Sequence, residues 1–233
     1  MNSRTQPDST IHIVEKAKAF GASMAGITSI TSLQNAPSYE VYGNAEWPVE
    51  AKSLIVLAQV HEISVPELDW WDDKNGGTPG DRQLGSIANS LRQWLNEELN
   101  IDAWSLPYHI EKGGIFLKDA AALAGLGTMG KNNLLITPEF GPRIRLRALL
   151  LNVDLEPTGP IDFTPCEACN MPCRRVCPQK AFKNDSYNRI LCNEQMKTDE
   201  MNRVIFKKSE NNNLPSICIK YCRACELACP ADR

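Results

Sequence analysis

All nine cysteines of this 233-residue chain lie between Cys166 and Cys229, and the first 165 residues contain none. Seven of them form two motifs with short spacings that end in Cys-Pro, which are Cys166-x2-Cys169-x3-Cys173-x3-Cys177-Pro178 and Cys222-x2-Cys225-x3-Cys229-Pro230. Cys192 and Cys218 lie between the two motifs. A C-x2-C turn is short enough to bring two thiolates to one metal site. A disulfide framework would spread its cysteines along the chain, so the pattern indicates metal binding.

The Cys-Pro ending of each motif indicates iron–sulfur chemistry. In two-cluster ferredoxins, the final cysteine of each motif binds the other cluster. This rule predicts two [4Fe–4S] clusters with these ligands: Cys166, Cys169, Cys173 and Cys229 for one, and Cys177, Cys192, Cys222 and Cys225 for the other. The spare cysteine is Cys218, unless Cys218 replaces Cys192 as a ligand. Structural zinc, which also takes four cysteines, is the alternative.

Charge divides the chain into two parts. Residues 160–233 carry 12 Lys and Arg against 9 Asp and Glu, whereas residues 1–159 carry 13 against 19. The breaker-rich segment 157–160, Pro-Thr-Gly-Pro, lies at the change. We therefore expect two domains, residues 1–157 and 158–233. The net charge of −3 gives no global attraction for nucleic acid.

The first domain is expected to combine helices with a sheet. Apolar spacing predicts amphipathic helices, and apolar β-branched runs predict strands. The predicted helices cover 10–20, 87–99 and 116–124, the predicted strands cover 53–60, 133–137 and 144–153 with a weaker one at 23–27, and 70–77 is predicted to be an exposed loop. This alternation is typical of an α/β or α+β layered domain.

A glycine-rich segment, residues 125–132 (GLGTMGKN), matches the pattern GxGxxG. A phosphate-binding loop follows a strand and opens a helix, so that helix N–H groups point at the phosphate. Here the glycines close a predicted helix and lead into a predicted strand. The order favours a helix end with a tight turn over nucleotide binding. Contact with another cofactor is the alternative, because glycine lets backbone approach a ligand closely.

The chain is expected to be cytoplasmic. No stretch approaches the roughly 20 apolar residues that a membrane span needs. Residues 1–8 are polar and have neither an apolar signal core nor a twin-arginine pair. A reducing compartment keeps thiols available for metals.

Three segments, together with the cysteine array, resemble a known family. They are residues 51–57 (AKSLIVL), 124–135 (AGLGTMGKNNLL) and 137–143 (TPEFGPR). In this order they are similar to epoxyqueuosine reductases and to the corrinoid reductive dehalogenases. The likeness runs from Gly21 to Pro230.

The resemblance implies an α+β fold: a nitroreductase-like sheet domain flanked by helices, followed by a ferredoxin-like module with two [4Fe–4S] clusters. The sheet domain would bind cobalamin base-off, with no protein histidine below the cobalt. A ferredoxin- or flavodoxin-type donor would supply electrons, which pass through the clusters to the corrinoid and reduce a small or nucleoside-like substrate. The cofactor contacts would come from Gly125, Gly127, Gly130, Lys131 and Asn132.

The resemblance also places a catalytic acid at Glu111. In epoxyqueuosine reductases a carboxylic acid protonates the substrate oxygen as the carbon–oxygen bond opens. A carboxyl group in a closed apolar pocket can keep its proton at neutral pH. The alternative is a carboxylate that faces solvent or pairs with Lys112. Tyr108 and His109 are alternative proton donors.

Some features depart from the family pattern. Three residues separate Cys169 from Cys173 where epoxyqueuosine reductases have two, the family acid is Asp rather than Glu, and the sequence ends three residues after Pro230. With no basic stripe, a small molecule is expected as substrate before tRNA. A second hypothesis is a non-catalytic two-cluster electron carrier that serves a partner enzyme, which could itself be corrinoid. A third keeps the sheet domain without corrinoid.

Overall fold

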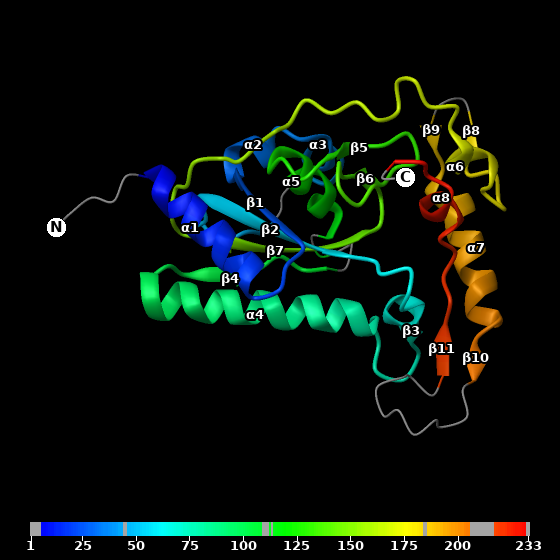
Figure 1. Ribbon diagram of the computed structural model, residues 1–233, viewed down its shortest axis with the longest axis horizontal. Coiled ribbons are helices and arrows are strands. Elements are labelled where there is room, and N and C mark those ends of the chain that lie inside the picture. The colour runs from blue at the N-terminus through cyan, green and yellow to red at the C-terminus, as the bar shows by residue number, and fades with distance from the viewer. Residues whose placement is uncertain are drawn as a thin grey trace. The chain divides into compact units, whose positions relative to one another are not determined.

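A computed structural model describes residues 6–43, 46–108, 112, 114–183, 186–205 and 217–231 (Figure 1). The chain divides into two compact units, each assembled from three segments. The first unit contains Met1–Gln59, Leu84–Met129 and Ile144–Phe163, and the second contains Val60–Gln83, Gly130–Arg143 and Thr164–Arg233. The domain boundary expected after residue 157 stays a prediction.

The first unit is built on a four-stranded sheet with strand order β1-β2-β7-β4. Strands β1 and β2 pair antiparallel, with Gly26 opposite Val56, and β4 and β7 pair antiparallel, with Trp104 opposite Leu150. The elements are α1 (Gln6–Ala19), β1 (Met24–Ser29), α2 (Ile30–Gln34), α3 (Pro37–Tyr42), β2 (Ser53–Val60), most of α4 (Pro79–Leu99), β4 (Ala103–Ser105), α5 (Leu117–Leu123), β5 (Thr128–Met129) and β7 (Ile144–Leu151). The expected mixture of helices and sheet is confirmed.

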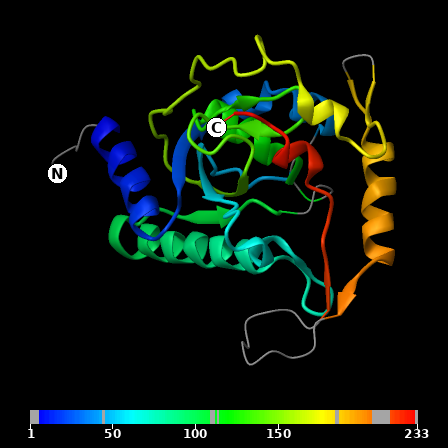
Figure 2. The same cartoon turned by 45° about the vertical axis from the view of Figure 1, so that its right-hand side comes forward.

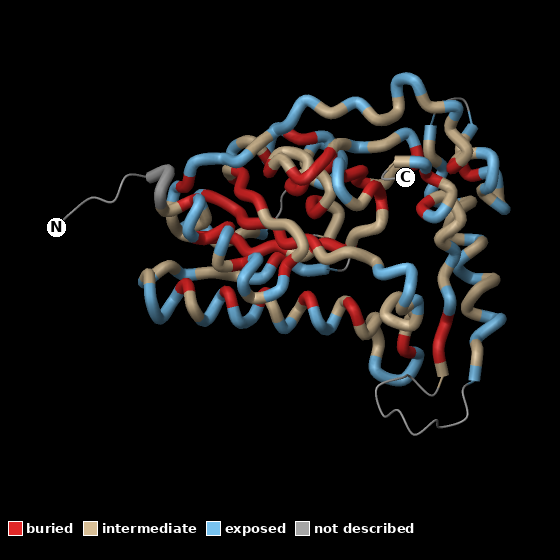
Figure 3. Tube along the Cα trace, in the orientation of Figure 1, coloured by how far each residue is buried: buried red, intermediate tan, exposed pale blue. Residues whose placement is uncertain are grey.

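Helices cover both faces of this sheet, with α1 and α4 on one face and α2, α3 and α5 on the other (Figure 1). Side chains alternate along a strand, and both sets on β2 are buried. Ile55 and Leu57 join the core formed with α1 and α4. Buried residues recur along one side of α4, at Leu84, Ala88 and Leu91 (Figure 3). The sheet therefore forms the middle layer of three.

Glycine at position 26 allows α5 and the sheet to approach closely. A Cβ at Gly26 would lie 2.3 Å from the carbonyl oxygen of Ala124 and 2.5 Å from Cδ1 of Leu126. Such distances are shorter than van der Waals contact, so no side chain fits there. This close packing explains why position 26 is a glycine. The same glycine made the prediction of a strand at 23–27 weak.

Several predicted elements differ at their ends. The strand at 53–60 is confirmed, but α4 begins at Pro79 rather than at residue 87. The two extra turns are mainly polar, so apolar spacing did not predict them, although they bury Leu84. The strand expected at 133–137 reduces to β6 (Leu135–Ile136). The short strand β4 was not predicted, since three residues carry too little periodicity.

The second unit contains short elements around the cysteines. They are the 3₁₀ turn at Pro66–Asp69, β3 (Trp71–Asp72), β6, α6 (Pro172–Arg175), β8 (Phe182–Lys183), β9 (Ser186–Tyr187), α7 (Arg189–Met201), β10 (Val204–Ile205), β11 (Ile217–Ile219) and α8 (Ala224–Leu227). Strands β10, β11 and β3 form one sheet, β8 and β9 form a hairpin, and α6 packs against α8. Figure 2 shows α7 leading into β10.

The predicted exposed loop at 70–77 is wrong in part. Trp71 and Asp72 form β3, which pairs with β11, and Asp72 is only 3% exposed. The Asp72 carboxylate accepts hydrogen bonds from the backbone N–H groups of Lys74 and Asn75, both at 3.0 Å. A buried aspartate therefore organises the turn. Among the described residues, no helix is long and apolar enough to cross a membrane.

Candidate iron–sulfur centre

One set of four cysteines gathers around α6 and the end of α8. Cys173 and Cys229 are buried, each 5% exposed, and Cys166 and Cys169 are half-buried. Burial raises the pKa of the Cys173 thiol, and the charges of Cys229, Cys166 and Cys169 raise it further. The four thiols are thus close enough to interact electrostatically. We call them the first thiol group.

A second set of four contains the remaining predicted ligands. Burial raises the pKa of Cys225 to about 12, with contributions from Cys222, Cys192 and Cys177. The pKa of Cys222 is also raised, first by burial and also by Cys177 and Cys192. These four thiols are the second thiol group. Cys222 is its exposed member.

Backbone N–H groups point at sulfur atoms in both groups. Lys131 N donates to Cys166 Sγ at 3.5 Å, and Met171 N donates to Cys169 Sγ at 3.3 Å. In the second group, Ala181 N donates to Cys177 Sγ at 3.3 Å. Such bonds favour the thiolate and tune the reduction potential of a bound cluster.

Crowded thiols suit a cationic cluster. Each thiolate makes its neighbours harder to ionise, and bound iron would reverse that effect. Among the residues that the structure describes, no group of three or more His, Cys, Asp or Glu side chains is arranged to hold a metal ion. A [4Fe–4S] cluster takes one thiolate at each of its four irons, so its ligands stand farther apart than those of a single ion.

Cys218 lies apart from this electrostatic pattern. It is fully buried on β11, opposite Asp72 on β3 and Val204 on β10. Burial raises the pKa of its thiol, and the charges that act on it belong to Lys220 and Asp72. Cys192, in contrast, interacts with Cys225. This contrast supports Cys192 as the fourth ligand of the second group.

We expect Cys218→Ala to leave the iron content of the reconstituted protein unchanged, because the side chain would be only a packing residue. The matched variant Cys192→Ala should lose about half of the iron, since it removes one ligand of the second cluster. Iron per chain, measured after anaerobic purification, checks both. Loss of iron in Cys218→Ala with full iron in Cys192→Ala would reverse the assignment.

The glycine-rich segment is tightly packed by protein. Gly125 has a φ of +78° after the end of α5, and a Cβ there would lie 2.9 Å from the carbonyl oxygen of Thr158. Gly127 is buried. At Gly130 a Cβ would lie 2.4 Å from Cδ1 of Ile136. The predicted helix end and tight turn are confirmed, and close backbone packing is sufficient reason for Gly125 and Gly130. Cofactor contact by these glycines stays a prediction.

The two residues after Gly130 differ from the glycines. The backbone of Lys131 donates to the first thiol group, and its carbonyl oxygen accepts from Arg174 Nε at 2.9 Å. Asn132 is 2% exposed, and its Oδ1 accepts from Leu134 N at 3.2 Å. Among the residues that the structure describes, its Nδ2 finds no hydrogen-bond partner. An unpaired buried amide donor costs about 1–3 kcal/mol, so this group fits a ligand that accepts a hydrogen bond.

The predicted catalytic residue, Glu111, lies outside the described residues, as does His109. Their roles stay predictions. Tyr108 is 42% exposed and lies under the Arg147 guanidinium, whose central carbon is 4.6 Å from the centre of the ring.

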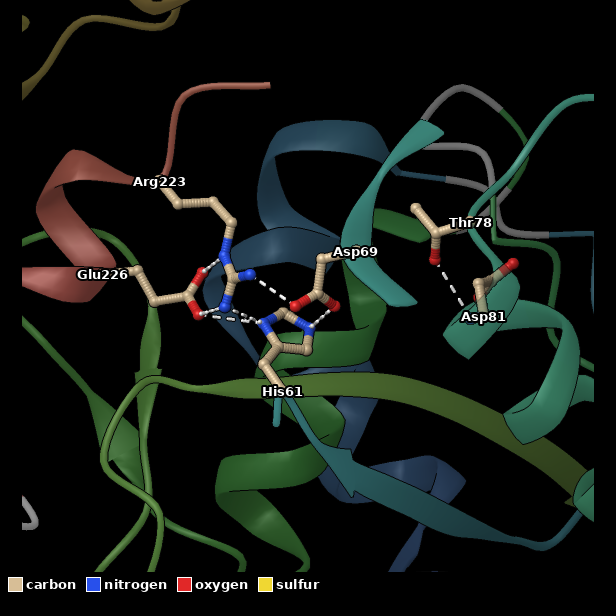
Figure 4. Close-up of polar contacts among 6 residues, drawn as sticks. All are labelled: His61, Asp69, Thr78, Asp81, Arg223 and Glu226. Carbon is tan, nitrogen blue, oxygen red and sulfur yellow. Dashed lines mark hydrogen bonds and ion pairs between the residues drawn. The ribbon is translucent and has the colours of Figure 1, made fainter. Parts of the chain in front are cut away.

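Sequence reasoning missed a cluster of one imidazole, one guanidinium and two carboxyl side chains, which belong to His61, Arg223, Asp69 and Glu226 (Figure 4). Nδ1 of His61 lies 2.9 Å from Oε1 of Glu226, and Nε2 lies 3.7 Å from Oδ1 of Asp69. The Arg223 guanidinium donates to both carboxylates. An acidic residue inside the Cys225-x3-Cys229 spacing was the available signal.

Comparisons with known proteins agree with the expected resemblance. No protein-family model matches the chain. Over 152 residues, or 65% of the chain, it is 29% identical to the epoxyqueuosine reductase of Lactococcus garvieae (strain Lg2) and covers 40% of that protein. It is also 46% identical to the tetrachloroethene reductive dehalogenase of Sulfurospirillum multivorans over 65 residues. These residues make up 27% of this chain and 13% of the dehalogenase.

Solved structures share the fold. The epoxyqueuosine reductase from Streptococcus thermophilus aligns with a TM-score of 0.64 and 19% identity, over 96% of this chain and 66% of that one. The catabolic reductive dehalogenase NpRdhA aligns with a TM-score of 0.63 and 16% identity, over 100% of this chain and 33% of that one, and its structure contains 3-bromo-4-hydroxybenzoic acid. Another epoxyqueuosine reductase structure holds a tRNA-Tyr stem loop. The chain thus spans about 40% of the first curated relative.

Proposed function

We propose that the chain is a reductase that carries two [4Fe–4S] clusters and delivers their electrons to a corrinoid. The observation that carries this proposal is the division of eight cysteines into two thiol groups. Each group contains the four cysteines that the crossed rule of two-cluster ferredoxins pairs. The similarity to epoxyqueuosine reductases and reductive dehalogenases supports the reductase activity.

Burial suggests the direction of electron flow. In the second thiol group Cys222 is exposed, whereas the first group contains the buried Cys173 and Cys229. An external donor would therefore deliver electrons to the second cluster, which would pass them to the first. Basic residues exceed acidic residues in 160–233, which favours an acidic donor of the ferredoxin or flavodoxin type.

The first thiol group connects to the candidate corrinoid contacts. Lys131 donates its backbone N–H to Cys166, and the next residue, Asn132, has the unpaired Nδ2. The rim of a corrin carries carboxamide oxygens, which accept hydrogen bonds, so Lys131 and Asn132 would hold cobalamin there. Bound cobalamin would supply a strongly reducing cobalt centre. Glu111 would hold and release the proton that the substrate takes up.

The substrate is proposed to be a small or nucleoside-like molecule that accepts electrons and a proton. The relatives bind both kinds, a halogenated hydroxybenzoate in one and a tRNA stem loop in another. The net charge of −3 favours the small molecule. The second candidate, an electron carrier that serves a partner enzyme, is favoured by the exposed thiol Cys222.

Metal content tests the proposal. After anaerobic reconstitution with iron, sulfide and hydroxocobalamin and removal of the excess, we expect about eight irons per chain from two four-iron clusters, and about one cobalt. Asn132→Ala should lower the cobalt content and leave the iron unchanged, because it removes the unpaired donor proposed for the corrinoid and no cysteine ligand, although the bond from Leu134 N to Asn132 Oδ1 is lost as well. About eight irons without cobalt would favour the electron carrier. Absence of iron would overturn both functions.

A further inference from the structure

A groove of about 720 Å³ lies between α4 and β4 in the first unit. Strand β4 is an edge strand, because it comes last in the order β1-β2-β7-β4 and pairs with β7 alone (Figure 1). Ala103 and Trp104 of β4 line the groove, together with Asp102 and several residues of α4. The groove therefore borders the edge of β4 that β7 does not occupy.

The hydrogen bonds between β4 and β7 show which backbone groups of β4 face this outer edge. The carbonyl oxygen of Asp102 accepts from Asn152 N at 3.1 Å, and Leu106 N donates to the carbonyl oxygen of Ala148 at 2.9 Å. In an antiparallel pair, residues that face the neighbouring strand alternate with residues whose N–H and C=O groups point the other way. Positions 102, 104 and 106 thus face β7, and positions 103 and 105 face outward.

The outer edge of β4 is open to a further strand. Among the residues that the structure describes, the backbone N–H and C=O groups of Ala103 and Ser105 have no hydrogen-bond partner. Proteins usually protect an exposed edge with a charged residue or a proline, and β4 contains neither. Its central residue, Trp104, is only half-buried.

The outward groups of β4 are arranged so that two copies of the strand complement each other. A two-fold axis beside Trp104 would place Ala103 of each copy opposite Ser105 of the other. Both would be hydrogen-bonded pairs, so every outward N–H and C=O group of the two strands would find a partner. Trp104 would lie opposite Trp104 of the second copy, and an aromatic pair across two strands stabilises their pairing.

The helical wall of the groove is suited to a second copy by its lack of net charge. Five of its residues are polar but uncharged, and their spacing places them along one side of α4: Ser86, Asn89, Ser90, Gln93 and Asn96. The groove contains one cation, Arg92, and one anion, Asp102. Two copies would therefore meet here without the repulsion between like charges that the net charge of −3 causes elsewhere.

We infer that the chain forms a two-fold symmetric dimer through β4, in which the two four-stranded sheets continue into each other. A second copy is favoured over an unrelated peptide because its β4 satisfies all the outward backbone groups and brings the half-buried Trp104 against its own equivalent. Tryptophan is typical of the centre of protein interfaces. The inference involves neither thiol group, so it is independent of the proposed function.

Sedimentation equilibrium and amide hydrogen exchange of the full chain test the inference. With rising protein concentration, the mass should increase from one chain to two, because association follows mass action. Over the same range, exchange of the Ala103 and Ser105 N–H groups, followed by NMR, should slow by about tenfold or more. The Trp104 N–H group faces β7, so it should exchange slowly at every concentration.

Ser105→Pro should raise the dissociation constant of the dimer at least tenfold, because it removes an outward N–H group and places a ring at the edge. The matched control, Ser105→Ala, keeps that N–H group and should leave the dissociation constant unchanged. Asn89→Lys should also weaken the dimer, since it brings a like charge from each copy to the groove, whereas Asn89→Gln should not.

Three results would overturn the inference. One is a wild-type chain that stays a monomer at every concentration, and the second is a dimer that both Ser105→Pro and Asn89→Lys leave intact. The third is slow exchange of the Ala103 and Ser105 N–H groups in the monomer, which would mean that another segment covers the edge. If circular dichroism shows that Ser105→Pro does not fold, Asn89→Lys decides by the same criterion.

Discussion

Cys173→Ala is expected to reduce the iron content from about eight to about four per chain and to abolish the EPR signal of one reduced cluster. Cys173 is buried and interacts with the other three thiols of the first group, so its loss leaves that group with three ligands. The second group shares none of these cysteines. Iron analysis and EPR of the dithionite-reduced protein measure both effects.

The paired variant is Cys225→Ala, which should remove the other cluster because Cys225 interacts with Cys222, Cys192 and Cys177. The two variants should therefore retain different EPR signals, and the double variant should contain almost no iron. The crossed ligand sets would be wrong if one substitution removed all iron while the other removed none.

Gly26→Ala is expected to lower the free energy of unfolding by about 1–3 kcal/mol, which is the usual range for an overpacked core. The added methyl group would meet the backbone carbonyl oxygen of Ala124 at 2.3 Å, and backbone cannot turn aside as a side chain can. Strand β1 would have to move away from α5. Denaturant unfolding followed by circular dichroism measures the change.

Gly85→Ala is the matched control, since it makes the same chemical change in an open place. Gly85 lies inside α4, and a Cβ there would meet no atom of the described part of the chain within 4 Å. Alanine should stabilise that helix by roughly 0.5–1 kcal/mol because it restricts the unfolded chain more than glycine does. If Gly26→Ala proved as stable as Gly85→Ala, that result would contradict the tight packing of β1 at Gly26.

The sequence predicted the elements that have strong local patterns. The run at 53–60 is mostly apolar and forms β2, in which both sets of side chains are buried from residue 53 to residue 58. Similarly, the cysteine spacings predict two sets of four thiols, and members of each set act on one another's pKa values; their assignment as cluster ligands stays a prediction. In both cases nearby residues in the chain carry most of the information.

Features that depend on distant residues were not predictable. His61 and Glu226 are 165 residues apart, and no local pattern connects them. The sequence around Asp72 predicts an exposed loop, yet Asp72 is buried and belongs to β3, which pairs with β11. The polar first turns of α4 gave no periodic signal, although they belong to the same helix as Leu91 and Leu95.

Helix α8 also has a consequence for the order of assembly. Under the proposed ligand sets, the first cluster needs Cys229 and the second needs Cys222 and Cys225, so neither set is complete without residues 222–229. During synthesis the cysteines from 166 to 192 leave the ribosome earlier and must wait as free thiols. Iron insertion would therefore follow translation of this last segment, and a chain interrupted before it would carry neither cluster in its finished form.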